Sequence, residues 1–212
     1  MKNDKKYWES YYKKNSKPTD PSSFAEFISK HLEKDKLLVE LGCGNGRDSL
    51  FFADKLNVIA IDQVECEMDY LNREHKTETV TFIADDFTNL KNSENEILNQ
   101  DIDYIYSRFT FHSINETKEN NTLDWICETL NEGGMFFLEA RSIKDPMFKK
   151  GTSLSESENF TDHYRRYMNF DKIQEKIESR NLEIIYKIED KDLVVYKDDN
   201  PYVIRIIARK LG

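Results

Sequence analysis

The sequence has few of the residues that cross-link or interrupt a chain, with 7 glycines, 4 prolines and 3 cysteines in 212 residues. Cys43, Cys66 and Cys127 are widely spaced and odd in number, and no CxxC pair is present. This pattern argues against a disulfide framework and against the common cysteine zinc sites. We expect the cysteines to be reduced and mostly structural, and we expect no metal site.

The sequence also lacks long apolar runs and an excess of positive charge. No stretch reaches the roughly 18 apolar residues that a membrane-spanning helix needs, so no membrane partner is expected. The first ten residues, MKNDKKYWES, lack the apolar core of a signal peptide, which predicts a cytoplasmic protein. With 40 acidic and 31 basic residues the net charge is -9, so nucleic acid is not an expected partner. The oligomeric state stays open.

Short β-rich runs alternate with amphipathic helical runs along the chain. A strand, a helix and a strand in succession predict a doubly wound α/β fold, a parallel sheet with helices on both faces. The last two β runs, 182–189 and 202–209, have no helix between them and predict an antiparallel C-terminal hairpin. The length fits one domain, 1–212, with a helical cap over 1–34. The other predicted strands are 37–41, 57–61, 80–84, 103–107 and 135–140, and the predicted helices include 47–55, 67–76, 91–100 and 122–131.

Three glycines stand at every second position in VELGCGNGRDS, directly after the first predicted strand. In a doubly wound sheet, ligands bind where this strand turns into the first helix. Glycine at 42, 44 and 46 tolerates positive φ and lets the peptide groups of the loop approach a ligand. The dinucleotide fingerprint GxGxxG needs a glycine where this chain has Arg47, so a phosphate-cradling loop is poorly matched.

Acidic residues follow the next two strands. Asp62 ends the second strand run, and Asp85 and Asp86 follow the third, ahead of Phe87. Together with Glu40 and the glycines, this pattern resembles the class I S-adenosylmethionine-dependent methyltransferases. The stretch GCGNGRDSLFFA is similar to their tellurite-resistance and thiopurine branch. The resemblance implies a Rossmann-like, mainly parallel, seven-stranded sheet of order 3-2-1-4-5-7-6.

The resemblance also implies S-adenosylmethionine as the cofactor and S-adenosylhomocysteine as the product. Asp62 would accept hydrogen bonds from both ribose hydroxyls, and Glu40 would lie near the methionine amino group. Either Asp85 or Asp86 would bind the adenine amino group, and we favour Asp85. The full implied set of cofactor-binding residues is Glu40, Gly42, Gly44, Gly46, Asp62, Gln63, Asp85, Asp86, Phe87, Ser107 and Arg108.

His112 follows the fourth predicted strand, where residues of this fold face the transferred methyl group. A neutral imidazole can take a proton from the acceptor near neutral pH, so His112 is the candidate catalytic base. A structural histidine at the start of a helix is the alternative. The N-terminal aromatic residues also have two interpretations, packing on the core or closure over the cofactor. They are Tyr7, Trp8, Tyr11 and Tyr12.

The segment 141–169 concentrates basic and aromatic residues within an acidic protein. Loops of this length without a clear helix or strand pattern are usually functional, so we interpret the segment as a substrate lid. Adjacent Arg165 and Arg166 predict a small anionic acceptor, phosphorylated or nucleotide-linked, because arginine binds such groups through two bonds. A solvated charge run is the alternative. The candidate substrate-binding residues are Arg141, His163, Tyr164, Arg165 and Arg166.

The sequence therefore predicts methyl transfer to an oxygen or nitrogen of a small metabolite, in surface-polysaccharide or specialised-metabolite biosynthesis. The composition, rich in Lys, Asn, Glu and Ile, is typical of an AT-rich bacterial genome. Two alternatives stay open: a nicotinamide-dependent oxidoreductase on the same fold, and a non-catalytic S-adenosylmethionine-binding protein. A nucleic-acid methyltransferase is disfavoured by the charge and by SRFTF where an Asn-Pro-Pro-Tyr motif would stand.

Overall fold

A computed structural model describes residues 2–75, 77–98, 100–161, 163–194 and 199–212. The chain divides into two compact units, Met1–Tyr106 and Ser107–Gly212. Within the described ranges, the helices are all too short or too polar to cross a bilayer.

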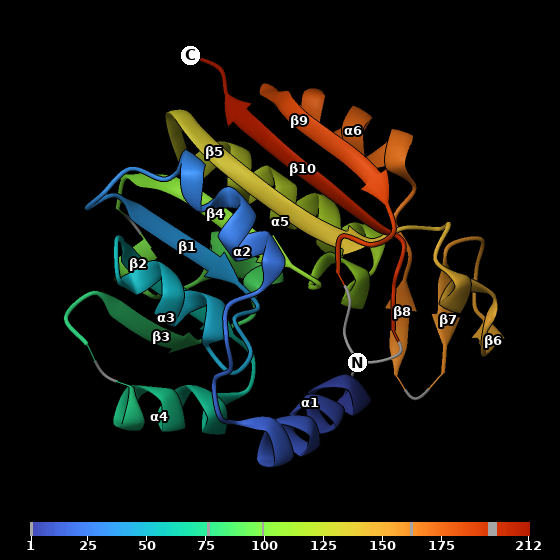
Figure 1. The fold of residues 1–212 in the computed structure, drawn as a ribbon, viewed down its shortest axis with the longest axis horizontal. Helices are drawn as coiled ribbons and strands as arrows, with labels where there is room; N and C mark the ends of the chain where they lie inside the picture. The colour runs from blue at the N-terminus through green and yellow to red at the C-terminus, as the bar shows by residue number, and fades with distance from the viewer. Residues whose placement is uncertain (1, 76, 99, 162, 195–198) are drawn as a thin grey trace. The chain divides into compact units, whose positions relative to one another are not determined.

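The central sheet consists of β1 (Leu37–Leu41), β2 (Asn57–Asp62), β3 (Val80–Ala84), β4 (Ile102–Arg108), β5 (Leu130–Arg141), β9 (Leu182–Asp190) and β10 (Val203–Lys210). Its strand order is β3-β2-β1-β4-β5-β10-β9. β2 pairs in parallel with β1 and β3, with Ile59 opposite Val39 and Thr81. β10 runs antiparallel to both β5 and β9. Numbered within this sheet, the order is 3-2-1-4-5-7-6, which confirms the predicted fold class and its C-terminal hairpin (Figure 1).

In the first unit, β1 and β2 are almost continuously apolar because helices cover the sheet. The strands LLVEL and NVIAID are buried except at their first residues, as expected for parallel strands covered on both faces. Helix α3 (Arg47–Ala53) packs against β2, and α4 (Glu65–Glu74) packs against β3. The carboxyl end of β1 thereby meets the start of α3.

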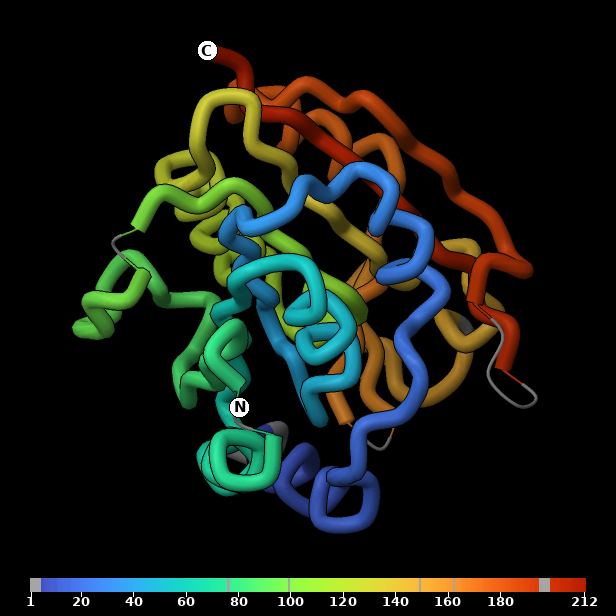
Figure 2. The backbone as a smooth tube through the Cα atoms, turned by 60° about the vertical axis from the view of Figure 1, so that its left-hand side comes forward, coloured from blue at the N-terminus to red at the C-terminus, as the bar shows by residue number. Residues whose placement is uncertain are grey.

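Two helices precede β1. Helix α2 (Ser23–Ile28) is capped by Ser22, whose side-chain oxygen accepts the N–H of Ala25 at 3.1 Å. This hydrogen bond satisfies one of the free N–H groups at the helix start. Phe24 of this helix is completely buried. Helix α1 (Lys2–Asn15) lies beside α4, and Figures 1 and 2 both show this pairing.

The second unit contains α5 (Glu116–Thr129) and α6 (Phe170–Glu178) with β5, β9 and β10. Asn115 and Asn169 cap the two helices by accepting the N–H groups of Lys118 and Lys172 at 2.9 and 3.0 Å. Fully buried side chains on β5 and β10, among them Phe136, Leu138 and Ile206, form the core of this unit.

Two segments differ from the sequence prediction. In place of a helix, the described part of 91–100 contains the end of the 3₁₀ helix Phe87–Asn92 and a 3₁₀ turn at Glu96–Leu98, because Ser93 and Asn95 side chains bind neighbouring backbone N–H groups. The segment 141–169 is not an irregular loop. It carries a small antiparallel sheet of β6 (Thr152–Ser153), β7 (Glu158–Phe160) and β8 (Tyr164–Arg166).

Candidate functional site

The loop after β1 turns at three glycines. Gly42, Gly44 and Gly46 have φ angles of 76°, 57° and 74°, in the left-handed region that side chains disfavour. The N–H groups of Gly42 and Cys43 both donate to the carbonyl of Ile61, at 2.8 and 2.9 Å, which fixes the loop against β2. All three glycines therefore have the backbone conformation that the sequence predicted.

Two of these glycines make room for different neighbours. A Cβ on Gly46 would lie 2.9 Å from Phe82 and 3.1 Å from Leu71, so this glycine lets β3 and α4 pack closely. A Cβ on Gly44 would lie 2.7 Å from the Tyr12 hydroxyl oxygen. The bare backbone at Gly44 thus admits a polar group from the N-terminal helix.

Helix α1 is held on the glycine loop at its C-terminal end. The Asn45 side chain donates to the carbonyls of Asn15 and Lys17, at 3.2 and 3.1 Å. Trp8 stacks on Tyr12, with ring centroids 6.0 Å apart. Burial, with the charge of Asp62 adding to it, raises the pKa of the Tyr12 hydroxyl well above its usual value. Tyr12 therefore stays protonated and able to donate a hydrogen bond.

Asp62, at the end of β2, turns its carboxylate toward the same loop. It is 8 % exposed and accepts the N–H groups of Gly44 and Val64, both at 3.1 Å. Burial raises the pKa of Asp62, while these backbone donors act in the opposite direction. A carboxylate has about four acceptor positions, so further hydrogen bonds can be accepted. Gln63, the next residue, is exposed.

Glu67 is a buried acid that the sequence patterns did not single out. It lies in the first turn of α4 and is 4 % exposed. Within the described part of the chain, its Oε1 has no hydrogen-bond partner. Burial first, and the charge of Asp62 second, raise the pKa of Glu67 to about 7. The apolar spacing of α4 could have revealed it, because an acid occupies a position on the buried face of that helix.

Glu40 and Asp48 are buried acids that tie the loop to its surroundings. Glu40 accepts the hydroxyl of Ser49, one turn into α3. Asp48 accepts the N–H and the hydroxyl of Ser22 at 2.7 Å each, and the Tyr106 hydroxyl at 2.9 Å. Asp48 therefore joins the starts of α2 and α3 to β4. The sequence pattern around Asp48 does not indicate this role.

Asp85 and Asp86 differ in their surroundings. The N–H of Asp85 donates to the Asp62 carbonyl at 3.1 Å, and its half-buried carboxylate accepts the Ser93 hydroxyl at 2.5 Å. Asp86 is exposed and caps a 3₁₀ helix by accepting the N–H of Thr88 at 3.0 Å. The structure thus brings Asp85 next to Asp62, and Phe87, two residues after Asp85, is half-buried.

In the second unit, a strained aromatic residue follows β4. Phe109 has φ of 55°, which is rare for a bulky side chain, and its N–H donates to the Glu139 carbonyl at 2.8 Å. The guanidinium carbons of Arg108 and Arg141 lie 4.4 and 5.8 Å from the centre of its ring. Arg108 also forms an ion pair with buried Glu139 at 2.8 Å. Ser107 is fully buried and shares a hydrogen bond with Thr110.

His112 lies beside this aromatic ring. Its imidazole is 5.4 Å from the Phe109 ring, it is 6 % exposed, and its Nδ1 lacks a hydrogen-bond partner within the described ranges. Burial lowers its pKa well below the usual value, and the charges of Arg141, Arg165, His163 and Arg108 lower it further. His112 is therefore neutral at physiological pH and sits within a cluster of positive charge.

The candidate substrate residues of the small sheet have separate surroundings. Tyr164 donates to Glu158 at 2.5 Å, and Arg165 donates to Thr161. Arg166 is 7 % exposed, forms an ion pair with Glu119, and donates from Nε to the Ile114 carbonyl at 3.1 Å. Arg165 therefore belongs with the charges around His112, whereas Arg166 is directed to α5.

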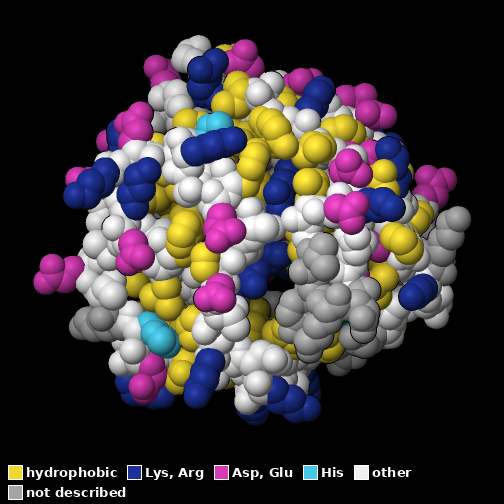
Figure 3. Space-filling model, in the orientation of Figure 1, with side chains coloured by type: hydrophobic (Ala, Val, Ile, Leu, Met, Phe, Trp, Pro, Cys, Tyr) yellow, Lys and Arg dark blue, Asp and Glu magenta, His cyan; other side chains and the backbone are white. Residues whose placement is uncertain are grey.

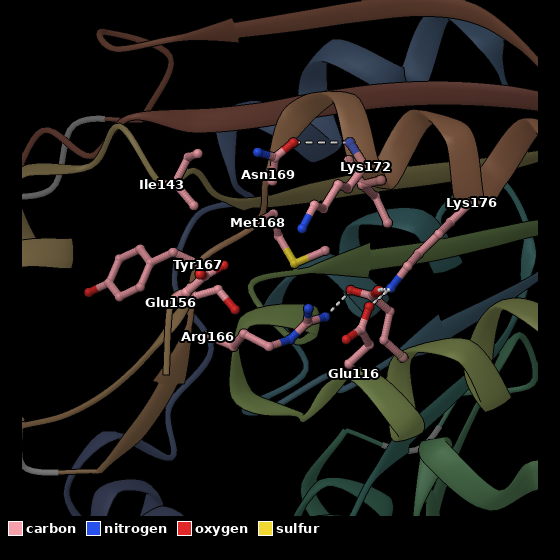
Figure 4. A pocket seen from close by; sticks show the side chains of 12 residues that line it. Glu116, Ile143, Glu156, Arg166, Tyr167, Met168, Asn169, Lys172 and Lys176 are labelled. Atoms are coloured by element: carbon pink, nitrogen blue, oxygen red, sulfur yellow. Dashed lines mark hydrogen bonds and ion pairs between the residues drawn. The ribbon is translucent and has the colours of Figure 1, made fainter. Parts of the chain in front are cut away.

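A cavity of about 270 Å³ lies beside Arg166 (Figure 4). Some of its charged lining is paired: Lys176 contacts Glu116 and Glu119 at 2.5 and 2.7 Å, and Arg166 contacts Glu119. Figure 4 shows these side chains meeting, with dashed lines between them. Its lining does not include the basic residues whose charges act on His112, so we do not assign the substrate to it.

Comparison with known proteins gives one family match. Residues 38–134 match the family described as "Methyltransferase domain". This range contains the glycine loop, Asp62, Asp85 and His112. A comparison with curated protein sequences found no match.

Solved structures with a similar fold include several methyltransferases. An S-adenosylmethionine-dependent methyltransferase from Clostridium acetobutylicum has 17% identity and a TM-score of 0.70, with 98% of each chain covered. A TehB-like methyltransferase from Corynebacterium glutamicum has 17% identity and a TM-score of 0.65, covering 97% of this chain and 96% of that one. The Burkholderia thailandensis 1,6-didemethyltoxoflavin-N1-methyltransferase, with bound 1,6-didemethyltoxoflavin and S-adenosylhomocysteine, has 18% identity and a TM-score of 0.66. The match covers 89% of this chain and 77% of that one. At these identities the likeness concerns the fold.

Proposed function

We propose that this chain, whose residues 38–134 match the methyltransferase-domain family, is a class I S-adenosylmethionine-dependent methyltransferase that methylates an oxygen or nitrogen of a small anionic metabolite. The observation that carries this substrate class is that the charges of Arg108, Arg141 and Arg165 all act on buried His112. Arg108 pairs with Glu139, and Arg141 pairs with Asp145 and Asp199, so an anionic group of the acceptor would compete with these carboxylates. A phosphorylated or nucleotide-linked acceptor matches that charge. Such metabolites are made and used in the cytoplasm of bacteria, and we place the reaction there.

The residues of the first unit suit the cofactor. At Gly44 the space that a Cβ would fill is taken by the Tyr12 hydroxyl, so the cofactor would meet the glycine loop together with Tyr12. Asp62 is buried, oriented by two backbone N–H groups, and still able to accept hydrogen bonds from ribose hydroxyls. We assign the adenine amino group to Asp85 rather than Asp86, because Asp85 adjoins Asp62 and Asp86 caps a helix.

The second unit supplies the chemistry on the acceptor. When bound, S-adenosylmethionine supplies a methyl group on a positively charged sulfonium. Arg141 and Arg165 would hold the anionic group of the acceptor and fix its orientation. His112 is neutral at physiological pH and would accept the proton that the attacking atom loses. Its lowered pKa makes it a weak base, which suits an acceptor whose own proton is labile.

Calorimetric titration with S-adenosylhomocysteine tests the cofactor assignment. We expect micromolar binding by the wild type and at least a tenfold loss in Asp62→Ala, since a buried charged acceptor is worth about 1.5–3 kcal/mol. NAD serves as the competing ligand. Binding of NAD without S-adenosylhomocysteine would refute the proposal, and cofactor binding without turnover of any acceptor would indicate a non-catalytic binding protein.

A panel of acceptors tests the substrate class. Pairs of metabolites that differ only by a phosphate or carboxylate are offered with S-adenosylmethionine, and formation of S-adenosylhomocysteine is measured. We expect turnover of the anionic member of a pair only. Preference for the neutral members would remove the role given to the charges around His112.

A further inference from the structure

Glu67 is a buried acid for which the fold provides no evident partner. One of its carboxyl oxygens is without a hydrogen bond among the residues that the structure describes, although the residue is 4 % exposed. A buried polar atom without a hydrogen bond destabilises the folded protein. Such an atom calls for an explanation, and a ligand that completes the hydrogen bond is one.

The neighbours of Glu67 belong to the cofactor side of the enzyme. Asp62 Oδ1 accepts the N–H of Val64, and the Val64 carbonyl accepts the N–H of Glu67 at 3.0 Å, so the two acids are joined by one short turn. The charge of Asp62 acts on Glu67, and the charge of Glu67 acts on Tyr12 and Cys43. Cys43 also contacts Met68, the residue after Glu67, at 3.7 Å between sulfur atoms.

Glu67 changes charge in the physiological range, whereas several of its neighbours do not. Burial raises the pKa of Glu67 to about 7. Burial also raises the pKa of the Tyr12 hydroxyl and of the Cys43 thiol well above their usual values, so both stay neutral. The strand β3, against which α4 packs, has the sequence VTFIA and adds no titratable side chain. Among the residues that the structure describes, Asp62 is the group whose charge acts on Glu67.

We propose that Glu67 is a further cofactor ligand, whose protonated carboxyl hydrogen-bonds the ribose hydroxyls beside Asp62 and whose ionisation weakens cofactor binding. The inference rests on the proposed function, since it takes S-adenosylmethionine as the ligand. A neutral carboxyl can donate one hydrogen bond and accept others, which complements a diol that already donates to Asp62. Two adjacent carboxylates could only accept, and their charges would repel each other.

Calorimetry across pH tests this role without any acceptor. For the wild type, we expect the dissociation constant of S-adenosylhomocysteine to be about tenfold higher at pH 8 than at pH 6, because a group of pKa about 7 must regain its proton. At pH 8, titrations in buffers of different ionisation enthalpy should show the uptake of about one proton per ligand bound. Adenosine, which lacks the amino acid part, should show the same pH dependence.

Glu67→Gln keeps the shape and both hydrogen-bonding functions of a protonated carboxyl but cannot ionise. We expect the affinity of this variant for S-adenosylhomocysteine to be constant between pH 6 and pH 8, and binding to take up no proton. Glu65→Gln is the matched control, because Glu65 is an exposed acid in the same helical turn. It should retain the pH dependence of the wild type.

The outcomes separate this inference from the proposed function. If the wild type binds S-adenosylhomocysteine equally at pH 6 and pH 8 without proton uptake, the role of Glu67 is refuted and the cofactor assignment stands. The same conclusion follows if Glu67→Gln retains the pH dependence. If no variant and no wild-type sample binds the ligand at any pH, the proposed function itself fails. The wild-type titration is decisive even if the variant does not fold.

Discussion

At the scale of single residues, two features of Gly44 exclude a side chain: its positive φ angle and the close Tyr12 hydroxyl. Its φ of 57° costs a non-glycine residue about 1–2 kcal/mol, and a Cβ would stand 2.7 Å from the Tyr12 hydroxyl. We predict that Gly44→Ala lowers the free energy of unfolding by at least about 2 kcal/mol. Denaturant titration of the purified protein measures this loss.

Gly133→Ala is the control for Gly44→Ala. Gly133 also has positive φ, 76°, but nothing lies within 4 Å of where its Cβ would be. Its substitution should cost only the backbone term, about 1–2 kcal/mol. Combining Gly44→Ala with Tyr12→Phe should remove the extra loss in the free energy of unfolding that Gly44→Ala shows over Gly133→Ala. Equal losses in the free energy of unfolding for Gly44→Ala and Gly133→Ala would show that the Tyr12 hydroxyl does not occupy the space above Gly44.

At the scale of elements, the short strand β8 places two adjacent arginines, Arg165 and Arg166, in different surroundings. Successive side chains of a strand point to opposite faces, and only Arg166 reaches buried Glu119 on α5. Removing one partner of a buried ion pair costs about 3–5 kcal/mol. We predict a loss of about 3 kcal/mol in the free energy of unfolding for Arg166→Met, because Glu119 keeps its contact with Lys176.

Arg165→Met provides the matched comparison on the same strand. Arg165 is half-buried and bonds Thr161 within its own small sheet, so we expect a loss below about 1 kcal/mol. Its effect should appear as a higher KM for the acceptor, with the affinity for S-adenosylhomocysteine unchanged. A larger loss of stability in Arg165→Met than in Arg166→Met would reverse the two assignments.

The same elements show how far the sequence could lead. The predicted strands 37–41 and 80–84 match β1 and β3 to the residue, because each is an apolar run bounded by polar residues. The predicted helix 122–131 begins too late, since the cap at Asn115 extends α5 through a polar first half. The sheet β6-β7-β8 could not be predicted, because its strands are two or three residues long and gain their stability from pairing with one another.

The candidate site shows the same division between local and tertiary signals. The glycine loop and Asp62 follow from position at the carboxyl ends of strands, which a sequence pattern can locate. Tyr12 becomes a neighbour of that loop only when α1 packs beside α4, and Glu67 is buried only when α4 packs against β3. Arg165 and Arg166 look alike in the sequence, because the pattern contains no information about which one meets Glu119.

At the scale of the whole molecule, the excess of acid sets the kind of acceptor that can approach. The net charge is -9, and on the face shown in Figure 3 acidic and basic side chains are interspersed. Binding of DNA or RNA depends on many lysines and arginines neutralising successive phosphates, and it weakens steeply with salt. The positive charge around His112 comes mainly from Arg108, Arg141 and Arg165, which are half-buried, and this suits one anionic group rather than a chain of them.

We therefore predict that the protein leaves a labelled 30-base-pair DNA and a single-stranded RNA of the same length unbound at micromolar concentration and 150 mM salt. Fluorescence anisotropy measures this, and a repeat at 20 mM salt amplifies any weak electrostatic binding. A mononucleotide carrying one phosphate group should still bind, because it can reach Arg141 and Arg165 without bringing further phosphates against the acidic surface. Micromolar binding of the duplex, lost as the salt rises, would instead point to a nucleic-acid substrate. The charges around His112 would then contact one phosphate of a polymer whose other phosphates are held elsewhere on the protein.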